Sequence, residues 1–424
     1  MEPLLLPPIP DLHRIEVYEA HGGYAMLRKA LEMQPDDIIE EVKKSNLRGR
    51  GGACFPAGLK WSFMPKKTDK PKYLCVNGDE SEPGTFKDRQ IFECNPHLMI
   101  EGAIIAAHAV GAGMVYLYVR GEYIKWIRMV QRAVDEAYAK GYLGQSILGS
   151  TVNVEFTIHR GAGAYICGEE SSLMNSIEGE RGYPRVKPPF PAQNGLWGCP
   201  TTINNVETIA NVPIILRLGG EAYAKIGHPK HPGPLLVGVS GHVNKPGVYE
   251  MPTGVLLTEI IEKYAGGVPG NKRIKAVIPG GSSTKIIRGD ALEGVTMDAD
   301  GLLAAGSSVG TAGMVVMDED TDLIRVISRI THFYHHESCG QCTPCREGTG
   351  WMFKILKRFE NSEARAADID LLLDIANNIE GNTVCALGDA AAWPVQSMIE
   401  RFRDEFERRV KEPASRLPAP TAAA

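Results

Sequence analysis

Four of the nine cysteines have a spacing that suits a redox-active metal centre. Cys339, Cys342 and Cys345 follow one another at C-x2-C-x2-C spacing, and Cys385 lies forty positions beyond the third of them. Thiolate is the ligand that soft iron prefers, and three close thiolates plus one distant one suit the four corners of a cubane cluster. Structural zinc sites more often take their ligands in two separated pairs. We therefore expect a [4Fe-4S] cluster, and a four-cysteine zinc site is the alternative.

A glycine-rich segment near the N-terminus has the composition of an anion-binding loop. Gly49 and Gly51 leave bare backbone whose N–H groups can approach a phosphate, and Arg50 and Lys60 add positive charge. The dinucleotide-binding fingerprint would have a third glycine where Cys54 stands, and it follows a strand, whereas this segment follows a predicted helix. We therefore expect no standard Rossmann turn here, and an ordinary glycine-rich turn is the alternative.

Further polar groups follow two predicted strands. The strand at 73–77 leads into Asp79, Glu80 and Glu82, which could bind sugar hydroxyls or amides or could form a solvated acidic loop. The strand at 152–158 leads into a second glycine-rich turn at 160–170 and then a helix at 171–177. Because open α/β sheets bind ligands at the ends of their strands, both loops are candidate binding segments.

The pattern of elements predicts three domains and a tail. Alternating helices and strands indicate an α/β domain at 1–228, in which Thr201 is expected to begin a helix that runs to Leu218. Short strands at 234–240, 247–251 and 275–279, with a helix at 257–265, indicate a small β-grasp-like domain at 229–320. Helices at 323–334, 346–359, 366–379 and 390–410 indicate a four-helix bundle at 321–412 that carries the cysteines, followed by a disordered tail at 413–424.

Composition limits the possible partners. The chain of 424 residues has a formal net charge of -5, which weighs against nonspecific nucleic-acid binding. The clustering of four of nine cysteines suits a metal site in a reducing compartment better than a disulfide framework. No apolar run is long enough to span a bilayer, so we expect no direct membrane insertion.

Five motifs together resemble one family, the flavin- and NADH-binding subunit of NADH-quinone oxidoreductase (respiratory complex I), of the 51 kDa type. They are RGRGGACFPAGLKWSF at 48–63, NGDESEPGTFKDR at 77–89, RGAGAYICGEE at 160–170, KPPFPAQNGLWGCPTTINNVET at 187–208 and ESCGQCTPCREG at 337–348. The resemblance implies an atypical Rossmann-like FMN domain, a ubiquitin-like domain and a helical cluster domain. It also implies that the chain oxidises NADH by hydride transfer to FMN and passes electrons singly to the cluster and on toward quinone.

The resemblance also implies site residues. The FMN site would be lined by Gly49, Arg50, Gly51, Lys60, Asn77, Asp79, Tyr165, Gly168, Glu169, Asn204, Asn205 and Thr208. NADH would be contacted by Phe55, Phe63, Glu80, Glu82, Glu170, Lys187 and Phe190. The cluster would be ligated by Cys339, Cys342, Cys345 and Cys385, and no protein side chain is needed as a catalytic acid or base.

Partners and location follow from the same resemblance. The family's usual companions are a thioredoxin-like [2Fe-2S] subunit of the 24 kDa type and an iron–sulfur subunit of the peripheral arm. The chain would be cytoplasmic and peripheral to the inner membrane through the complex. Two alternatives are a diaphorase subunit of an NAD-linked hydrogenase or formate dehydrogenase, and a zinc-stabilised scaffold without redox activity.

The sequence departs from the family pattern at two positions. Relatives usually have glycine where Cys54 stands, so this side chain either alters the approach of the nicotinamide or points into the core. Gly78 replaces the usual alanine and adds backbone freedom.

Overall fold

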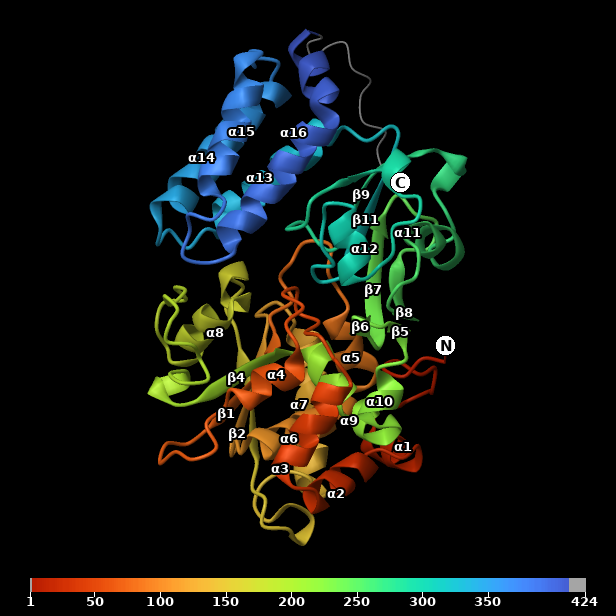
Figure 1. The fold of residues 1–424 in the computed structure, drawn as a ribbon, viewed down its shortest axis with the longest axis vertical. Helices are drawn as coiled ribbons and strands as arrows, with labels where there is room; N and C mark the ends of the chain where they lie inside the picture. Colours follow the sequence, from red (N-terminus) through yellow and green to blue (C-terminus); the bar gives the residue numbers. More distant parts are fainter. Residues whose placement is uncertain (1, 412–424) are drawn as a thin grey trace.

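The chain folds into three adjoining parts, which a computed structural model describes for residues 2–411. Figure 1 shows an α/β part below, a second sheet at the upper right and a group of long helices at the upper left. The tail predicted to be disordered lies outside the described residues. Within 2–411, no helix is both long enough and apolar enough to cross a membrane.

The first sheet is parallel and has a topological switch point beside one of its central strands. Its strands are β1 (Tyr73–Gly78), β2 (Met114–Val119), β3 (Glu155–Arg160) and β4 (Thr201–Asn205), in the spatial order β3-β2-β1-β4. Strand β1 pairs in parallel with β2 on one side and with β4 on the other. The chain therefore reverses its direction of strand addition beside β1, and such a switch point is where open α/β sheets bind ligands.

The helices of this part bury an almost wholly apolar core. Helix α6 (Pro96–Val110) has all but one of its residues buried and packs on α9 (Val206–Leu218), and both contact β1. The remaining helices are α1 (Ile15–Ala20), α2 (Ala25–Glu32), α3 (Pro35–Lys44), α4 (Ala57–Ser62), α5 (Asp88–Cys94), α7 (Ile124–Ala139), α8 (Glu170–Ile177) and α10 (Gly220–Tyr223).

One sequence prediction in this part is wrong. The segment from Thr201 was expected to begin a helix, but Thr201–Asn205 forms β4, and the helix begins at Val206. Asn205 does cap that helix, because its Oδ1 accepts hydrogen bonds from the backbone N–H groups of Glu207 and Thr208. The prediction missed the buried strand that comes immediately before this helix.

The second sheet is mixed. Its strands are β7 (Pro234–Gly241), β8 (Gly247–Pro252), β9 (Ile274–Ile278), β10 (Ile287–Arg288) and β11 (Gly313–Asp318), in the order β10-β9-β11-β7-β8. The central pair, β11 and β7, is parallel, and the flanking pairs are antiparallel. The helix predicted at 257–265 is a short α-helix, α11 (Leu257–Glu259), continued by a π turn at Ile260–Tyr264. A ladder of β5 (Gly227–His228) and β6 (His231–Pro232) precedes this sheet, and α12 (Ala299–Ala304) precedes β11.

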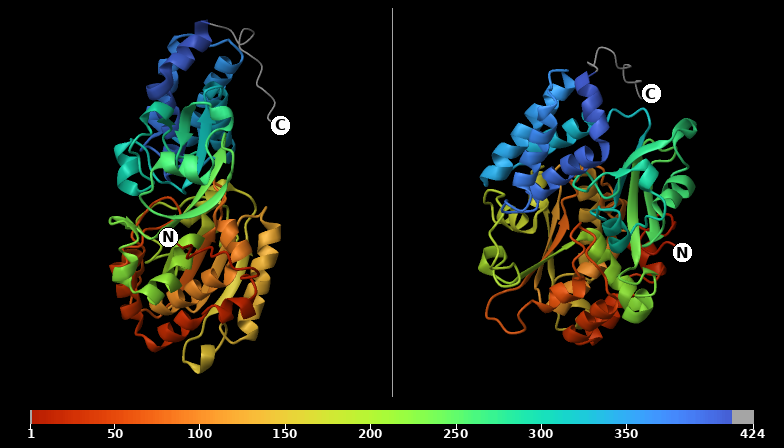
Figure 2. Two further views of the ribbon diagram at one scale, coloured as in Figure 1. Left: turned by 90° about the vertical axis from the view of Figure 1, so that its right-hand side faces the viewer. Right: turned by 45° about the horizontal axis from the view of Figure 1, so that its top comes forward.

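Four helices form the third part. They are α13 (Leu323–Glu337), α14 (Thr343–Glu360), α15 (Ala367–Ile379) and α16 (Leu387–Lys411), each close to its predicted range. The right-hand view of Figure 2 shows them above the first part and beside the second sheet. One hydrophobic cluster runs from Leu323 and Ile327 of α13 to Ile278 of β9, and to Ile166 and Ile203 of the first part. This shared core holds the cysteine-bearing helices against both sheets.

Candidate functional site: a four-thiol recess beside the switch point of a parallel sheet

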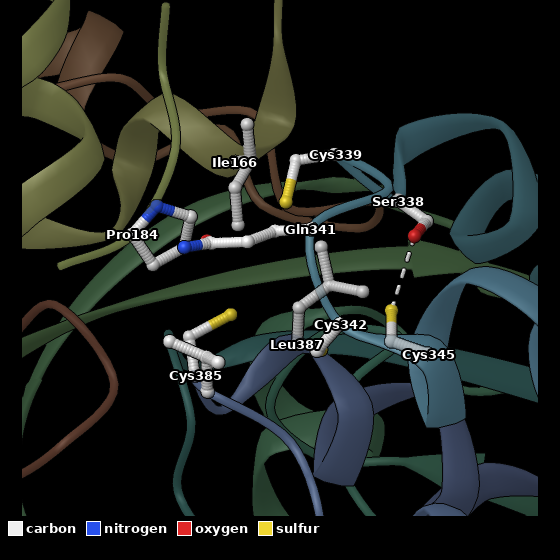
Figure 3. A pocket seen from close by; sticks show the side chains of 10 residues that line it. Ile166, Pro184, Ser338, Cys339, Gln341, Cys342, Cys345, Cys385 and Leu387 are labelled. Carbon is white, nitrogen blue, oxygen red and sulfur yellow. Dashed lines mark hydrogen bonds between the residues drawn. The ribbon is translucent and has the colours of Figure 1, made fainter. Parts of the chain in front are cut away.

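The four predicted cluster cysteines lie together at one end of the helical part. Cys339 and Cys342 lie in the loop between α13 and α14, Cys345 lies in the first turn of α14, and Cys385 lies between α15 and α16. They line one recess together with Ile166, Pro184, Ser338, Gln341, Val384 and Leu387. In Figure 3 the thiols of Cys339 and Cys385 point into it from opposite sides. The helices therefore bring the distant fourth thiol to the other three.

The donor set of this recess fits an iron–sulfur cluster. All four donors are sulfur, and the other lining side chains include the apolar Ile166 and Leu387. Among residues 2–411, no three His, Cys, Asp or Glu side chains are close enough together to hold one metal ion. Four thiols spread around one recess are the arrangement that a multi-iron cluster needs.

Two of the four thiols, Cys345 and Cys385, are protonated at neutral pH when no metal is bound. Burial raises the pKa of Cys345 to about 11 and that of Cys385 to about 12. The Ser338 hydroxyl lies 3.2 Å from Cys345 Sγ, as the dashed line in Figure 3 marks. Binding of a metal centre must therefore release protons from these thiols.

The two histidines next to the cysteine loop lie outside this recess. His336 is exposed and contacts Glu337, while His335 stacks on Phe353 with ring centroids 6.1 Å apart. Neither is among the residues that line the recess.

The glycine-rich loop packs directly on the carboxyl end of β4. The backbone N–H of Arg50 donates a hydrogen bond of 2.8 Å to Thr208 Oγ1, and a side chain at Gly51 would meet Asn205 Cβ at 3.1 Å. Trp61 of α4 donates its indole N–H to Asn204 Oδ1 over 3.0 Å. Five of the predicted FMN positions thus belong to this one junction of loop, strand end and helix start: Arg50, Gly51, Asn204, Asn205 and Thr208.

The carboxyl end of β1 carries a second set of predicted positions. Asn77 Nδ2 donates a hydrogen bond of 2.8 Å to the carbonyl of Gly168, and Asn77 Oδ1 accepts one from the N–H of Asp79. A Cβ at Gly168 would lie 3.2 Å from Asp79 Oδ2. Burial raises the pKa of Asp79 to about 7, although Ser81 donates a hydrogen bond to its carboxylate. The acidic loop is therefore packed into the site.

Two lysines and two glutamates converge between α4 and α8. Lys60 Nζ lies 2.9 Å from Glu170 Oε2, and Lys187 Nζ lies 2.7 Å from Glu170 Oε1 and 3.0 Å from Glu169 Oε1. Burial alone raises the pKa of Glu170, but the two lysines outweigh it and lower the pKa to about 2. The structure thus brings together residues that the sequence assigned to both FMN and NADH.

Three residues predicted to contact FMN or NADH have side chains that form hydrogen bonds with other groups of the protein. Glu80 accepts hydrogen bonds from the N–H groups of Asp88 and Arg89 and from the hydroxyl of Tyr123, so it caps α5. The Arg50 guanidinium is buried, contacts His231 and donates to the carbonyls of Pro232 and Pro234.

The third of these side chains is Glu82. Its carboxylate accepts hydrogen bonds from Tyr165, Ser282 and Ser283. The side chains of Glu80, Arg50 and Glu82 therefore hold the fold together around the site.

Exposed aromatic side chains flank the glycine-rich loop. Phe55 is 44% exposed and Phe63 is 54% exposed, and their ring centroids lie 6.2 Å apart. Phe190 is also half-exposed. These faces are free to receive a flat ring.

Cys54 points away from that exposed face. Its φ of 51° lies in the left-handed region that favours glycine, and its side chain packs against the apolar core of the second part. Of the two outcomes expected for this position, the structure favours the second, with the partly buried thiol packed against the core.

A buried charge cluster beside the site was not predicted. Lys87 is fully buried between Asp88 and Glu207, at 2.8 and 2.7 Å, and Asp88 Oδ2 accepts a hydrogen bond from Asn205. No residue type or spacing distinguishes this lysine from a surface one. Its position within the matched loop motif was the only available signal.

One short segment is the wall between the switch point and the recess. In the 3-10 turn η2 (Tyr165–Gly168), Ile166 lines the cysteine recess, while Gly168 accepts the hydrogen bond from Asn77. Cys167 between them is buried, as expected of a small core residue. The predicted flavin site and the predicted cluster site therefore share a wall a few residues wide.

Comparisons with protein families agree with this arrangement. The Nuo51 FMN-binding domain matches residues 42–214, an SLBB domain matches residues 235–326, and the NADH-ubiquinone oxidoreductase-F iron-sulfur binding region matches residues 325–409. The fold and the site thus define an iron–sulfur flavoprotein of the NADH dehydrogenase class.

The chain belongs to the family of NADH-quinone oxidoreductase F subunits, and this confirms the resemblance seen in the sequence. It is 56% identical over 400 residues to the F subunit of Rickettsia bellii (strain OSU 85-389), a match that covers 94% of this chain and 96% of the relative. It is 54% identical over 391 residues to the F subunit of Rickettsia typhi (strain ATCC VR-144 / Wilmington), which covers 92% and 93%.

A relative from another genus is nearly as similar. The second of the NADH-quinone oxidoreductase F subunits of Rhizobium meliloti (strain 1021) is 53% identical over 414 residues. That match covers 97% of this chain and 98% of the relative, so the likeness extends over all three parts of the fold.

Solved structures include a similar chain in a different enzyme. A chain of an NAD+-reducing [NiFe]-hydrogenase in the H2-reduced state superposes with a TM-score of 0.82 at 35% identity. The match covers 91% of this chain but only 64% of the hydrogenase chain. In the air-oxidised state the corresponding shares are 92% and 65%.

Proposed function

We propose that the chain is the NADH-oxidising subunit of a complex I-type enzyme, taking a hydride from NADH and passing electrons singly to a [4Fe-4S] cluster. The observation that carries this proposal is the shared wall at Tyr165–Gly168, which places a four-thiol recess directly behind the strand ends of the family's FMN-binding domain.

The chain's own residues would bind and orient the two cofactors. FMN, when bound, accepts the hydride of NADH and supplies the conversion from two-electron to one-electron transfer. The backbone at Gly49–Gly51 and the strand ends at Asn77, Asn204 and Asn205 would hold it, with Lys60, Asp79, Gly168, Glu169 and Thr208 around them. Arg50 and Tyr165 would support that site, since the side chain of each is bound to neighbouring residues.

The nucleotide would enter over the exposed aromatic face. Phe55, Phe63 and Phe190 would pack against the rings of NADH, and Lys187 would lie beside its phosphates. Glu170 stays ionised, which would repel a 2′-phosphate and favour NADH over NADPH. Glu80 and Glu82 would contribute by fixing the loop that carries Asp79.

The cluster would be ligated by Cys339, Cys342, Cys345 and Cys385. Ser338 would donate a hydrogen bond toward the sulfur of Cys345, and such bonds to sulfur tune the potential of iron–sulfur centres.

The finer fold and domain assignments are also part of the proposal. The order β10-β9-β11-β7-β8, with a parallel central pair, supports a ubiquitin-like β-grasp domain at 229–320. The helices α13–α16 support a four-helix cluster domain at 321–412, which leaves the FMN domain at 1–228.

Partner subunits would carry the electrons onward. We propose a thioredoxin-like [2Fe-2S] subunit and an iron–sulfur subunit of the peripheral arm as partners, and a cytoplasmic position peripheral to the inner membrane through the complex. The hydrogenase likeness favours a second candidate, a diaphorase subunit of an NAD-linked hydrogenase. The subunits that copurify with the chain would distinguish the two: quinone-linked iron–sulfur subunits in the first case, nickel–iron subunits in the second.

A direct test is the NADH–ferricyanide reaction of the purified protein containing FMN. We expect rapid turnover with NADH and much slower turnover with NADPH. A protein that binds FMN but oxidises neither nucleotide would contradict the proposal.

A further inference from the structure

The Glu82 carboxylate lies where the three parts of the chain meet. Its Oε2 accepts a hydrogen bond of 2.7 Å from the Tyr165 hydroxyl, and its Oε1 accepts bonds from the Ser283 N–H at 2.7 Å and the Ser282 hydroxyl at 3.2 Å. The Ser282 hydroxyl also lies 2.9 Å from the hydroxyl of Tyr334 in α13. We call Glu82, Tyr165, Ser282, Ser283 and Tyr334 the junction network.

The junction network is sealed from water on the side of the helices. Tyr334 is 0% exposed and Ser282 is 3% exposed. The Tyr165 ring packs edge-on against Phe333 and Tyr334, with centroids 5.2 and 5.9 Å apart. Buried hydroxyls that lose their partners are costly, so these bonds hold the three parts in one relative position.

Each end of the junction network leads to one of the two proposed cofactor sites. Tyr165 begins the wall segment Tyr165–Gly168, and Glu82 lies in the loop that follows β1. Tyr334 lies one helical turn before Ser338, whose N–H donates to the Tyr334 carbonyl, and Cys339 follows. The Tyr165 N–H also donates directly to Glu337, two residues before Cys339.

We propose that Ser282 and Tyr334 are positioning residues for electron transfer: by fixing Glu82 they hold the cysteine loop against the wall of the flavin site. This inference rests on the proposed function and goes beyond it, because it assigns a role to a residue of the second sheet's domain. Electron transfer weakens steeply with separation, so a loosened junction slows the step from flavin to cluster and leaves the step from NADH to flavin unchanged.

The test follows both steps in the protein carrying FMN and the cluster, mixed with NADH without oxygen. Flavin bleaching is read by absorbance and cluster reduction by freeze-quench EPR. Tyr334→Phe and Ser282→Ala should each slow cluster reduction roughly fivefold, the size of effect expected from one buried hydrogen bond, with flavin bleaching unchanged. The double variant should be no slower than the slower single variant, because both side chains act through one network.

A matched control removes a buried tyrosine hydroxyl that serves a single domain. The Tyr24 hydroxyl lies 3.0 Å from His97 Nδ1 within the first part, so Tyr24→Phe should leave both steps unchanged. Cluster reduction at the normal rate in both junction variants, or equal slowing in the control, would overturn the inference. If one variant fails to fold, the other decides. Failure of the proposed function would look different, since the unaltered protein would then show no flavin bleaching by NADH.

Discussion

Lys60 Nζ lies 2.9 Å from Glu170 Oε2, and this ion pair joins α4 to the start of α8 across 110 positions of sequence. Lys187, from a third segment, forms an ion pair with the same carboxylate, its Nζ 2.7 Å from Glu170 Oε1. The carboxylate of Glu170 thus joins three separate segments of the proposed nucleotide site through ion pairs.

Replacing that glutamate should destabilise the protein in a pH-dependent way. The folded pKa of Glu170 is about 2, below its ordinary value of 4.5, so its contribution is fully present above about pH 4.5 and is lost as the pH falls toward 2. Glu170→Gln should lower the free energy of unfolding at pH 7 by about 1–3 kcal/mol, since it removes the carboxylate that pairs with Lys60 and leaves Lys187 with Glu169 alone. Urea unfolding measures this change.

The control for Glu170→Gln is an exposed pair. Glu40 meets Lys43 on the surface of α3 at 2.7 Å, and Glu40→Gln should change stability by less than about 0.5 kcal/mol. Equal effects of the two substitutions at pH 7 would contradict the role given to Glu170.

Asp79 should have the opposite pH dependence. Its folded pKa of about 7 lies above its ordinary value of 3.8, so the folded state binds the proton more tightly and loses stability as the pH rises from about 4 to 7. Asp79→Asn should therefore be more stable than the unaltered protein at pH 8, by about 1–3 kcal/mol, and nearly equal to it at pH 4. Chemical unfolding of the FMN-free protein at both pH values tests this, with the exposed Asp69→Asn as control. If Asp79→Asn were less stable than the unaltered protein at pH 8, the claim that burial raises the pKa of Asp79 would be contradicted.

The Arg50 guanidinium should be needed for the attachment of the glycine-rich loop to the second domain. Its Nη2 donates to the carbonyls of Pro232 and Pro234 at 2.7 and 3.0 Å while its Nη1 contacts His231, and the single nitrogen of a lysine cannot replace both guanidinium nitrogens. Arg50→Lys should cost about 2–4 kcal/mol of unfolding free energy and weaken FMN retention.

Arg48→Lys is the matched control for Arg50→Lys. Arg48 also donates a hydrogen bond to a backbone carbonyl, that of Lys230, but from a more exposed position. Arg48→Lys should therefore lower the free energy of unfolding by less than about 1 kcal/mol. Thermal unfolding and the FMN content of the purified variants measure both changes. If Arg48→Lys lost more stability and more FMN than Arg50→Lys, the role given to Arg50 would be contradicted.

Loss of one cluster cysteine should separate the two halves of the reaction. Cys342→Ala should leave NADH–ferricyanide activity largely intact and abolish electron delivery to the partner subunit, because only the recess loses a ligand. Cys94→Ala, at an exposed cysteine far from the recess in sequence, should change neither activity. Loss of both activities in Cys342→Ala with FMN still bound would argue against this division of labour.

The sequence predicted the elements with strong periodicity and missed those that depend on tertiary pairing. Helices α13–α16 lie close to their predicted ranges because their apolar residues recur at helical spacing. Strand β4 was missed because Thr201–Asn205 is polar and ends in a helix cap. Its pairing with β1 buries the threonines, and no local pattern indicates that pairing.

The motifs predicted which residues belong to the site, but not the hydrogen bonds that these residues make within the protein. C-x2-C-x2-C spacing identified three thiols, and the helical packing then brings Cys385 to them. The carboxylates of Glu80 and Glu82 were predicted to contact a ligand. In the structure Glu80 accepts a hydrogen bond from the Tyr123 hydroxyl, and Glu82 accepts one from the Ser283 N–H. Sequence spacing cannot show such partners, since Glu82 and Ser283 are about two hundred positions apart.

The most direct test of the central claim is an anaerobic NADH titration of the purified protein, followed by optical and EPR spectra. We predict bleaching of a flavin band and a reduced [4Fe-4S] signal, with dithionite added if the cluster potential is low. A colourless, EPR-silent protein with one bound zinc, after anaerobic preparation, would contradict the claim and favour a zinc-stabilised scaffold.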